Sequence, residues 1–146
     1  IWVDADDTYP LEKVPEMAEA LQSSCDLVYA SRSWGRERIP VFNRVGNALF
    51  HFLTQRIYGF KPSDPCTGLC GVKKQYLEAM GLTSPRFGIE SEIAAKAGRM
   101  KLRMLDMPIE YRRRVGAAKL NGLVDGFEIL VTILRLLFWR PRKPGK

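Results

Sequence analysis

The chain has few of the residues on which zinc sites and disulfide frameworks depend. Its 146 residues include three cysteines and one histidine. An odd number of cysteines is not a disulfide framework, and Cys66, Cys70 and His51 offer neither a fourth ligand nor the usual spacing of a zinc site. We therefore expect reduced cysteines and a compartment that faces the cytosol.

Long uncharged apolar runs are also missing. In the most apolar segment, residues 120–139, the longest uncharged run is the six residues Ile129–Leu134, whereas a bilayer-spanning helix needs about 20. The segment is predicted to lie on an anionic membrane surface, because an apolar face is followed by basic residues. A core-packing helix with a solvated basic tail is the alternative. The apolar face comprises Leu123, Phe127, Leu130, Val131, Leu134, Leu137 and Phe138.

Net positive charge is absent from the first two thirds of the chain. Residues 1–95 hold 10 Lys and Arg against 12 Asp and Glu, a net charge of −2, and residues 96–146 hold 13 against 4, a net charge of +9. The basic part is predicted to face an anionic partner. Nucleic acid, a membrane surface and a phosphorylated substrate all fit this charge.

The apolar periodicity predicts strands that alternate with helices. Helices are expected over residues 10–22, 41–58, 73–80 and 89–98, and strands over residues 1–3, 26–30 and 104–111, with a further short strand after the turn signals of residues 63–65. Residues 33–40 are predicted to form a loop. The last strand is expected at a sheet edge, because Pro108 cannot donate to a strand ladder. The order of strand, helix and strand indicates an α/β fold with parallel strands.

The opening stretch, IWVDADDTYP, places carboxylates directly after an apolar strand. Asp4 and Asp6 would lie on the same side of the strand end, and such a pair needs a cation nearby. DxDxT is the motif of haloacid-dehalogenase-like phosphatases, in which Asp4 would be the nucleophile and Asp6 the acid or base. DxD is also the motif with which GT-A glycosyltransferases hold Mg²⁺ or Mn²⁺ against a nucleotide-sugar diphosphate. An acidic loop that caps the next helix is the third interpretation.

The remaining sequence favours the second motif. The phosphatase needs a late pair of acids at a strand end, and none of the four acids after residue 92 forms one. By contrast, nearly the whole chain resembles the family 2 glycosyltransferases, in the branch of dolichyl-phosphate mannose synthase-like and polyprenyl-phosphate enzymes. The matching stretches, in the family's order, are VDADDTYP, DLVYASR, FNRVGNALF, SDPCTGLCGVKK, FGIESEIAAKAGRMKLRMLDMPIEYRRRVGAAKL and DGFEIL.

This resemblance implies a fold and a division of the chain. The fold would be the C-terminal part of a GT-A (Rossmann-like) mixed sheet flanked by helices, with a C-terminal amphipathic helix. Residues 1–119 would be the metal and acceptor side of a catalytic domain, and residues 120–146 a membrane-surface helix with a basic tail. The nucleotide-binding part would precede Ile1. The enzyme would be a glycosyltransferase at the cytoplasmic face of a membrane, with a nucleotide-sugar donor and a polyprenyl phosphate acceptor, and no nucleic acid is expected.

The resemblance also implies roles for single residues. Asp4 and Asp6 would bind Mg²⁺ or Mn²⁺, with Thr8 where some relatives have a glutamine. Contacts to the acceptor phosphate, or to the loop over it, would come from Arg32, Arg44, Asn47, Arg114 and Lys119, since guanidinium and ammonium groups suit phosphate.

Two further acids are candidates for catalysis together with Asp6. Asp64 and Glu90 lie where many inverting GT-A enzymes place an acid that deprotonates a hydroxyl acceptor. A lipid phosphate is already an anion, so it does not need such a base. Asp64 could instead orient the substrate or begin a turn. A basic nucleic-acid-binding module remains the third functional alternative, and it depends only on the charge of residues 96–146.

Overall fold

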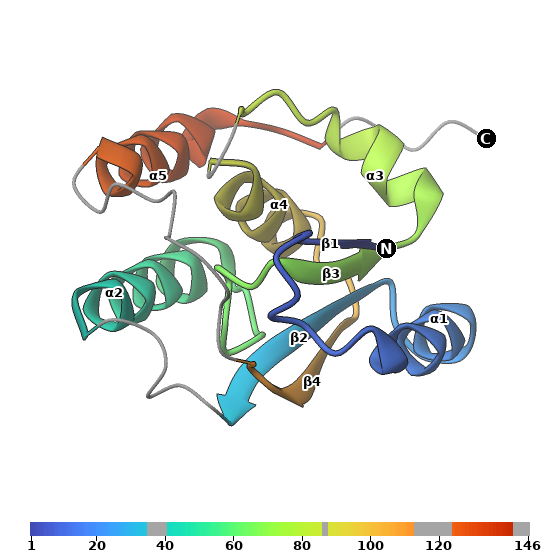
Figure 1. The fold of residues 1–146 in the computed structure, drawn as a ribbon. Coiled ribbons are helices and arrows are strands. Elements are labelled where there is room, and N and C mark those ends of the chain that lie inside the picture. Colours follow the sequence, from blue (N-terminus) through green and yellow to red (C-terminus); the bar gives the residue numbers. More distant parts are fainter. Residues whose placement is uncertain (35–40, 86–87, 113–123, 142–146) are drawn as a thin grey trace.

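The fold is a mixed α/β sheet flanked by helices, as predicted (Figure 1). A computed structural model describes residues 1–34, 41–85, 88–112 and 124–141. Its four strands are β1 (Trp2–Val3), β2 (Leu27–Trp34), β3 (Leu69–Val72) and β4 (Met104–Glu110), in the order β1-β3-β2-β4. Strand β3 runs antiparallel to β1 and β2, and β4 runs parallel to β2.

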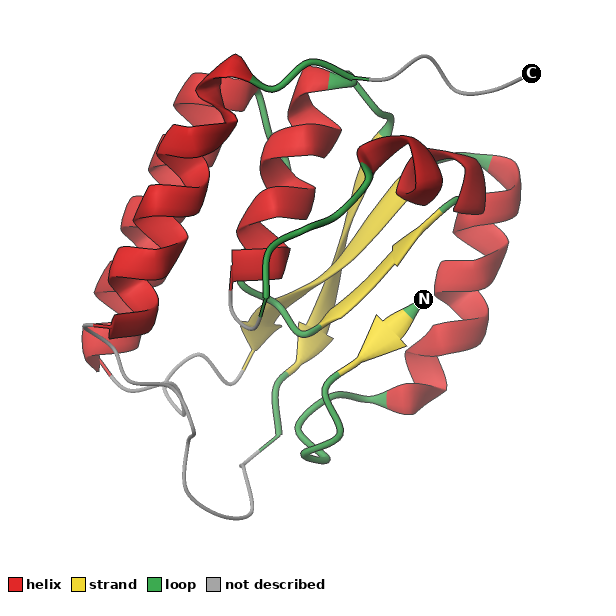
Figure 2. Ribbon diagram, turned by 90° about the horizontal axis from the view of Figure 1, so that it is seen from above, coloured by secondary structure: helices red, strands yellow, loops and turns green. Residues whose placement is uncertain are grey.

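The helices cover both faces of the sheet and add an outer layer. They are η1 (Leu11–Lys13), α1 (Val14–Ser23), α2 (Val41–Tyr58), α3 (Lys74–Met80), α4 (Gly88–Arg99), α5 (Val124–Arg135) and η3 (Leu136–Phe138). Helix α1 lies on one face of the sheet and α4 on the other, and α2 and α5 lie side by side beyond α4 (Figure 2).

Strand alternation explains how the two faces of the sheet are built. Val28 and Ala30 of β2 pack with Met17 of α1 in one cluster. Leu27 and Tyr29, which point the other way, pack in a second cluster under α3 and α4. Because both faces are covered, β2 is apolar at successive positions. A third cluster joins α2, α4 and α5 and contains Phe50, Tyr58, Ala95, Ile129, Ile133 and Leu136.

The structure corrects two details of the predicted arrangement. Strand–helix–strand order predicted parallel strands, but β3 lies between β1 and β2 and runs antiparallel to both. Strand β2 also continues to Trp34, so the loop predicted from residue 33 does not begin there. Residues 35–40 of that loop lie outside the described part of the chain. Among the strands of the described residues, β4 lies at an edge of the sheet, as Pro108 predicted.

Helix α5 has two different apolar faces. Ile129 and Ile133 are buried against α2 and α4. Phe127 and Leu134, from the face predicted to lie on a membrane, are 67% and 49% exposed. The helix therefore packs on the core and still presents an apolar surface. In the described part of the chain, every helix is too short or too polar to span a bilayer.

Candidate functional site

The predicted site lies at one edge of the sheet. Asp4 follows β1 directly, and Arg32 lies near the end of β2, which runs in the same direction. The segment of residues 63–68 leads into the antiparallel strand β3 and so reaches the same edge. Carboxyl ends of strands are where α/β sheets bind ligands. The topology therefore brings together residues that are up to 64 positions apart in the sequence.

Asp4 is held against a glycine. Its N–H donates to the carbonyl of Gly68 at 2.9 Å. A Cβ atom added to Gly68 would lie 2.1 Å from Oδ2 of Asp4, well inside the contact distance. The exposed Asp4 carboxylate can therefore keep this position only because residue 68 has no side chain.

Asp6 is held by the residue two positions later. Oδ1 of Asp6 accepts hydrogen bonds from the hydroxyl of Thr8 at 2.5 Å and from its N–H at 3.2 Å. The side chain of Thr8 is fully buried, so it fixes the half-buried Asp6 carboxylate to the core. Asp7, between them, adopts a φ of 59°, which Asp tolerates better than most residues. Thr8 thus holds the Asp6 carboxylate in position.

Tyr9 connects the acidic loop to the start of β3. Its hydroxyl oxygen accepts a hydrogen bond from the N–H of Gly68 at 2.7 Å. Burial raises the pKa of Tyr9 to about 12, so the phenol stays neutral. Its ring packs edge to face on Tyr111, with centroids 5.5 Å apart. The loop with the two aspartates is therefore tied to the sheet at a second point.

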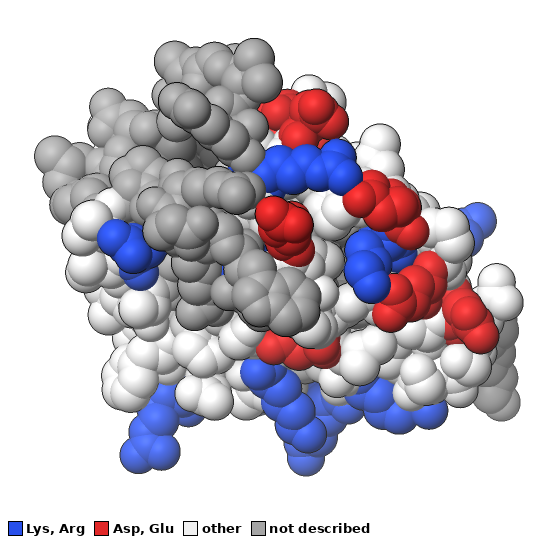
Figure 3. Space-filling view, turned by 60° about the horizontal axis from the view of Figure 1, so that its bottom comes forward, with Lys and Arg blue, Asp and Glu red and all other residues white. Residues whose placement is uncertain are grey.

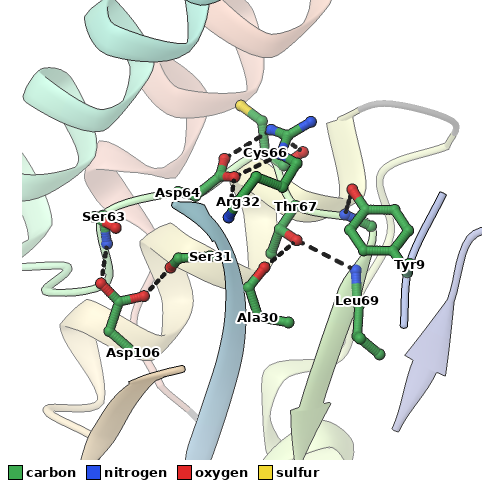
Figure 4. A network of polar contacts seen from close by, with 11 residues as sticks. Tyr9, Ala30, Ser31, Arg32, Ser63, Asp64, Cys66, Thr67, Leu69 and Asp106 are labelled. Atoms are coloured by element: carbon green, nitrogen blue, oxygen red, sulfur yellow. Dashed lines mark hydrogen bonds and ion pairs between the residues drawn. The ribbon is translucent and has the colours of Figure 1, made fainter. Parts of the chain in front are cut away.

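A buried ion pair joins β2 to the loop before β3 (Figure 4). Nε and Nη2 of Arg32 donate to the two carboxylate oxygens of Asp64 at 2.6 and 2.7 Å, and Nη2 also donates to the carbonyl of Cys66 at 3.0 Å. Arg32 is 7% exposed and Asp64 4%. Burial lowers the pKa of Arg32, but the hydrogen bonds and charge of Asp64 outweigh this effect and raise it, so the guanidinium stays charged.

Two more described side chains contact Arg32. With its amide oxygen turned toward Arg32, Asn47 of α2 accepts a hydrogen bond from Nη2 at 3.2 Å. The guanidinium carbon lies 5.4 Å from the centroid of the Tyr111 ring. Arg44, on the same helix, is exposed. The structure therefore brings Arg32, Asn47 and Asp64 together, and the contact of Arg32 and Asn47 with a phosphate remains a prediction.

Neighbouring hydrogen bonds brace this part of the edge. Asp106 of β4 accepts from the hydroxyl of Ser31 and, at 3.0 Å, from the N–H of Ser63. The hydroxyl of Thr67 donates to the carbonyl of Ala30 at 2.6 Å. These contacts fix both ends of the segment from residue 63 to 67, so that Asp64 meets Arg32 in a set position.

Glu90, in the first turn of α4, lies near the same edge. Burial, together with the charge of Asp4, raises its pKa to about 7, although a backbone hydrogen bond and the charge of Arg32 act in the opposite direction. Glu90 can therefore bind or release a proton near neutral pH. Glu92 is different, because it is fully buried in an ion pair with Lys96 at 2.5 Å and accepts a hydrogen bond from the N–H of Ser84. Of these two acids, only Glu90 has electrostatic contact with the site.

The cysteines behave as core residues. Burial raises the pKa of Cys66 to about 12 and also raises that of Cys70, so both thiols are neutral. Among the described residues, no three His, Cys, Asp or Glu side chains gather into a ready metal site. Asp4 and Asp6 offer hard oxygen donors of the kind that Mg²⁺ takes from a protein when substrate phosphates supply the rest. Their chemistry fits such an ion.

Several residues that shape this site were not predicted from the sequence. Tyr9, Thr67, Gly68 and Asp106 support the predicted aspartates and Arg32 through the contacts above. The sequence did contain a signal for Gly68, because this glycine lies in the turn that directly precedes β3. Arg114 and Lys119 lie outside the described residues.

The charged surface near this edge mixes both signs. On the face in Figure 3, Asp and Glu lie between Lys and Arg across the middle, and further Lys and Arg project along the lower rim. Arg112, for example, pairs with Glu12 at 2.6 Å. A nucleic-acid-binding face is typically a continuous basic patch, and the part of this face that the structure describes mixes both signs instead.

Comparison with known proteins confirms the sequence resemblance. A dolichyl-phosphate hexose transferase of Haloferax volcanii is 28% identical over 137 residues, which cover 93% of this chain. A dolichol-phosphate mannosyltransferase of Pyrococcus furiosus is 28% identical over 94% of the chain, and the low-salt glycan biosynthesis hexosyltransferase Agl6 of Haloferax volcanii is 30% identical over 85%. No protein-family model matches the chain. The chain is thus a homologue of family 2-like glycosyltransferases.

The similarity covers much of this chain but only part of each relative. The matched regions make up 60%, 40% and 31% of the lengths of the three proteins, in the order given above. The chain therefore spans about three fifths or less of the curated relatives that it matches.

Proposed function

We propose that this chain is the acceptor-side portion of a metal-dependent, inverting glycosyltransferase that moves a sugar from a nucleotide-sugar to a polyprenyl phosphate at the cytoplasmic face of a membrane. The main support is the similarity to a dolichyl-phosphate hexose transferase over 93% of the chain. The proposed metal ligands, Asp4 and Asp6, also lie at the end of a strand, on the same sheet edge as the buried pair of Arg32 and Asp64.

The chemistry suits an acceptor that is already ionised. An oxygen of the lipid phosphate attacks the anomeric carbon of the sugar, and the bond from that carbon to the nucleoside diphosphate breaks with inversion. The leaving diphosphate takes the electron pair. When bound by Asp4 and Asp6, Mg²⁺ or Mn²⁺ would neutralise the charge of that diphosphate. No side chain has to remove a proton from the acceptor.

This chemistry gives the remaining residues roles other than that of a base. Asp64 is buried against Arg32, so we assign it a positioning role for the guanidinium. Glu90, with a pKa of about 7, can donate a hydrogen bond to a bound substrate when protonated or accept one from it when ionised. Arg32, Arg44, Asn47, Arg114 and Lys119 remain the proposed contacts to the acceptor phosphate or its loop.

Substitution of Asp6 tests the metal site. In the complete protein, Asp6→Asn is expected to abolish transfer that depends on Mg²⁺ or Mn²⁺, because the amide keeps the shape but loses the charge. Transfer from radiolabelled nucleotide-sugar to polyprenyl phosphate would be measured across a metal titration. The matched control is Asp7→Asn, since Asp7 is exposed, and asparagine is also favoured at a φ of 59°.

Substitution of Arg114 in the same assay tests the acceptor site. Arg114→Ala is expected to raise the KM for the lipid phosphate by about tenfold or more, since a charge-assisted hydrogen bond to phosphate contributes roughly 1.5–3 kcal/mol. The KM for the nucleotide-sugar should change little. Wild-type transfer by both Asp6→Asn and Arg114→Ala would refute the assigned site.

A further inference from the structure

Helix α4 is enclosed by the rest of the protein, and it nevertheless contains a charged pair. It lies between the sheet and the outer helices α2 and α5 (Figure 2), and its residues from Ser91 to Gly98 are all buried. A helix enclosed in this way is usually apolar all round. Glu92 and Lys96, one turn apart, are 0% and 2% exposed. Both charges have lost their hydration, so the contacts that replace it indicate what the pair does.

The ammonium group of Lys96 binds the end of the preceding helix. It donates to the carbonyls of Met80 at 2.8 Å and Gly81 at 3.0 Å, where α3 ends, and to Glu92 at 2.5 Å. These three acceptors match its three N–H bonds. The nitrogen also lies 5.0 Å from the centroid of the Trp139 ring, directly after η3. Lys96 thus joins α4 to the C-terminal ends of α3 and η3.

The carboxylate of Glu92 binds the connection between α3 and α4. It accepts hydrogen bonds from the N–H groups of Thr83 at 3.0 Å and Ser84 at 2.6 Å, and from the hydroxyl of Thr83 at 3.3 Å. A rotation of α4, or a shift along its axis, would take one of the two buried charges away from these partners. Such a loss is far more costly than a small shift of apolar side chains. The ion pair therefore fixes α4 more strictly than apolar packing would.

Close packing against the outer helices leaves α4 little room to adjust. A Cβ atom added to Gly88 would lie 3.1 Å from Oγ1 of Thr132 in α5, and one added to Gly98 would lie 2.3 Å from the backbone oxygen of Tyr58. Both ends of α4 thus contact the outer helices closely. A change at the ion pair has to move the helix as a unit or loosen these contacts.

Glu90 lies on the other side of the same helix. With 3.6 residues per turn, residues two positions apart are separated by about 200° around the helix axis. The charges of Asp4 and Arg32 both influence the pKa of Glu90, so its half-buried carboxyl group is in electrostatic contact with the candidate site. Helix α4 is therefore anchored by Glu92 on one side and presents Glu90 to the site on the other.

We infer that Glu92 and Lys96 are positioning residues for the proposed sugar transfer, because their ion pair fixes α4 in the orientation that places Glu90 at the candidate site. This inference rests on the proposed function. The contacts of the pair are with the end of α3, the connection to α4 and Trp139. We therefore assign its effect on the reaction to Glu90.

A double-mutant cycle in the complete protein tests this role. The neutral variant, Glu92→Gln with Lys96→Met, removes both charges together and keeps an amide oxygen for the N–H groups of Thr83 and Ser84. Its kcat for sugar transfer should fall about tenfold, because small displacements of a group at the reaction centre are costly. Glu90→Ala should lower kcat by at least as much. Adding Glu90→Ala to the neutral variant should cause no loss beyond that of Glu90→Ala alone, since changes that act through one group are not additive.

The matched control is a second ion pair with a buried carboxylate. Asp26 is 6% exposed and pairs with Lys73 at 3.2 Å, next to the start of β2 and away from Arg32 near its end. Asp26→Asn with Lys73→Met should leave kcat unchanged, even where it lowers the melting temperature. Circular dichroism and the melting temperature would be measured for every variant, and kcat would be expressed per folded protein.

Each outcome of the cycle decides the inference. A wild-type kcat in the neutral variant or in Glu90→Ala would overturn it, and so would losses that multiply when the two are combined. If the neutral variant does not fold, Glu92→Asp takes its place in the cycle, because it keeps both charges and shortens the side chain by one methylene. Absence of transfer by the wild-type protein would refute the proposed function and the inference with it, whereas wild-type transfer with multiplying losses would refute the inference alone.

Discussion

At the scale of single residues, the position of Asp4 depends on the absence of a side chain at residue 68. Gly68→Ala would place a methyl group where the Asp4 carboxylate lies, 2.1 Å from Oδ2. Since Asp4 is exposed, we expect it to rotate away with little loss of stability. In the complete protein, metal-dependent transfer should fall about tenfold or more, because small displacements of catalytic groups are costly.

The measurement for Gly68→Ala is the rate of transfer against Mg²⁺ concentration, together with the melting temperature. Gly46→Ala is a matched control, because its added Cβ would come no closer than 3.9 Å to Phe50. An unchanged metal dependence in Gly68→Ala would show that the contact between Asp4 and Gly68 does not matter for function.

The buried carboxylate of Glu92 predicts how stability depends on pH. Burial alone would raise the pKa of Glu92, but hydrogen bonds from Lys96 and from the N–H groups of Ser84 and Thr83 lower it to about 2. A carboxylate whose pKa is lower in the folded state contributes stability above its unfolded value of 4.5, and loses this contribution as the pH falls toward 2. The free energy of unfolding should therefore decrease at acid pH as Glu92 becomes protonated.

Urea unfolding at several pH values tests the role of Glu92. At pH 7, Glu92→Gln should lower the free energy of unfolding by about 3–5 kcal/mol, because it leaves Lys96 buried without its charged partner. The difference from wild type should shrink between pH 4.5 and pH 2. A difference that is equal at pH 7 and pH 2 would contradict the assignment. Glu78→Gln is the control, since its ion pair with Lys74 is on the surface.

At the scale of elements, the packing of α2 on α4 depends on Gly98. A Cβ added at this position would lie 2.3 Å from the backbone oxygen of Tyr58, at the end of α2. The hydroxyl of Tyr58 in turn donates to the carbonyl of Ile133 in α5. Gly98 therefore allows the close helix contact on which the outer layer is built.

We expect Gly98→Ala to destabilise the protein. Overpacking typically costs about 1–3 kcal/mol, and the better helix propensity of alanine offsets at most about 1 kcal/mol of this. The free energy of unfolding in urea would be measured beside that of Gly46→Ala, which gains the same propensity without a clash. Equal stability of the two variants would show that α2 and α4 can move apart at no cost.

Elements were predicted well where periodicity and turn signals agree. Helix α2 begins and ends where its apolar spacing predicted, and α3, α4 and β4 lie within a residue or two of their predicted ranges. Pairing was harder to predict, because the strand β3 that separates β1 from β2 comes later in the chain than both. The buried and exposed sides of α2 were also hard to predict, since Val45 and Leu49 are apolar yet exposed.

At the scale of the whole molecule, the candidate site and the exposed apolar side chains of α2 lie on opposite sides of that helix. Asn47 faces Arg32 at the sheet edge, while Leu49 and Phe52 face outward. The sheet, then α4, and then the pair of α2 and α5 form successive layers on one side of α1 (Figure 2). The proposed transfer to a polyprenyl phosphate requires that this polar edge lie within reach of the lipid.

The sequence by itself determined the α/β class, most element bounds and the two metal-binding candidates, since each depends on spacing within a few residues. Only the tertiary structure decided that Asp64 pairs with Arg32 and that Gly68 makes room for Asp4. These contacts join residues far apart in the chain, and their strength depends on burial. The local sequence pattern predicts neither long-range contacts nor burial. It indicates which side of a helix or strand a residue lies on, but not which residues pack against that side.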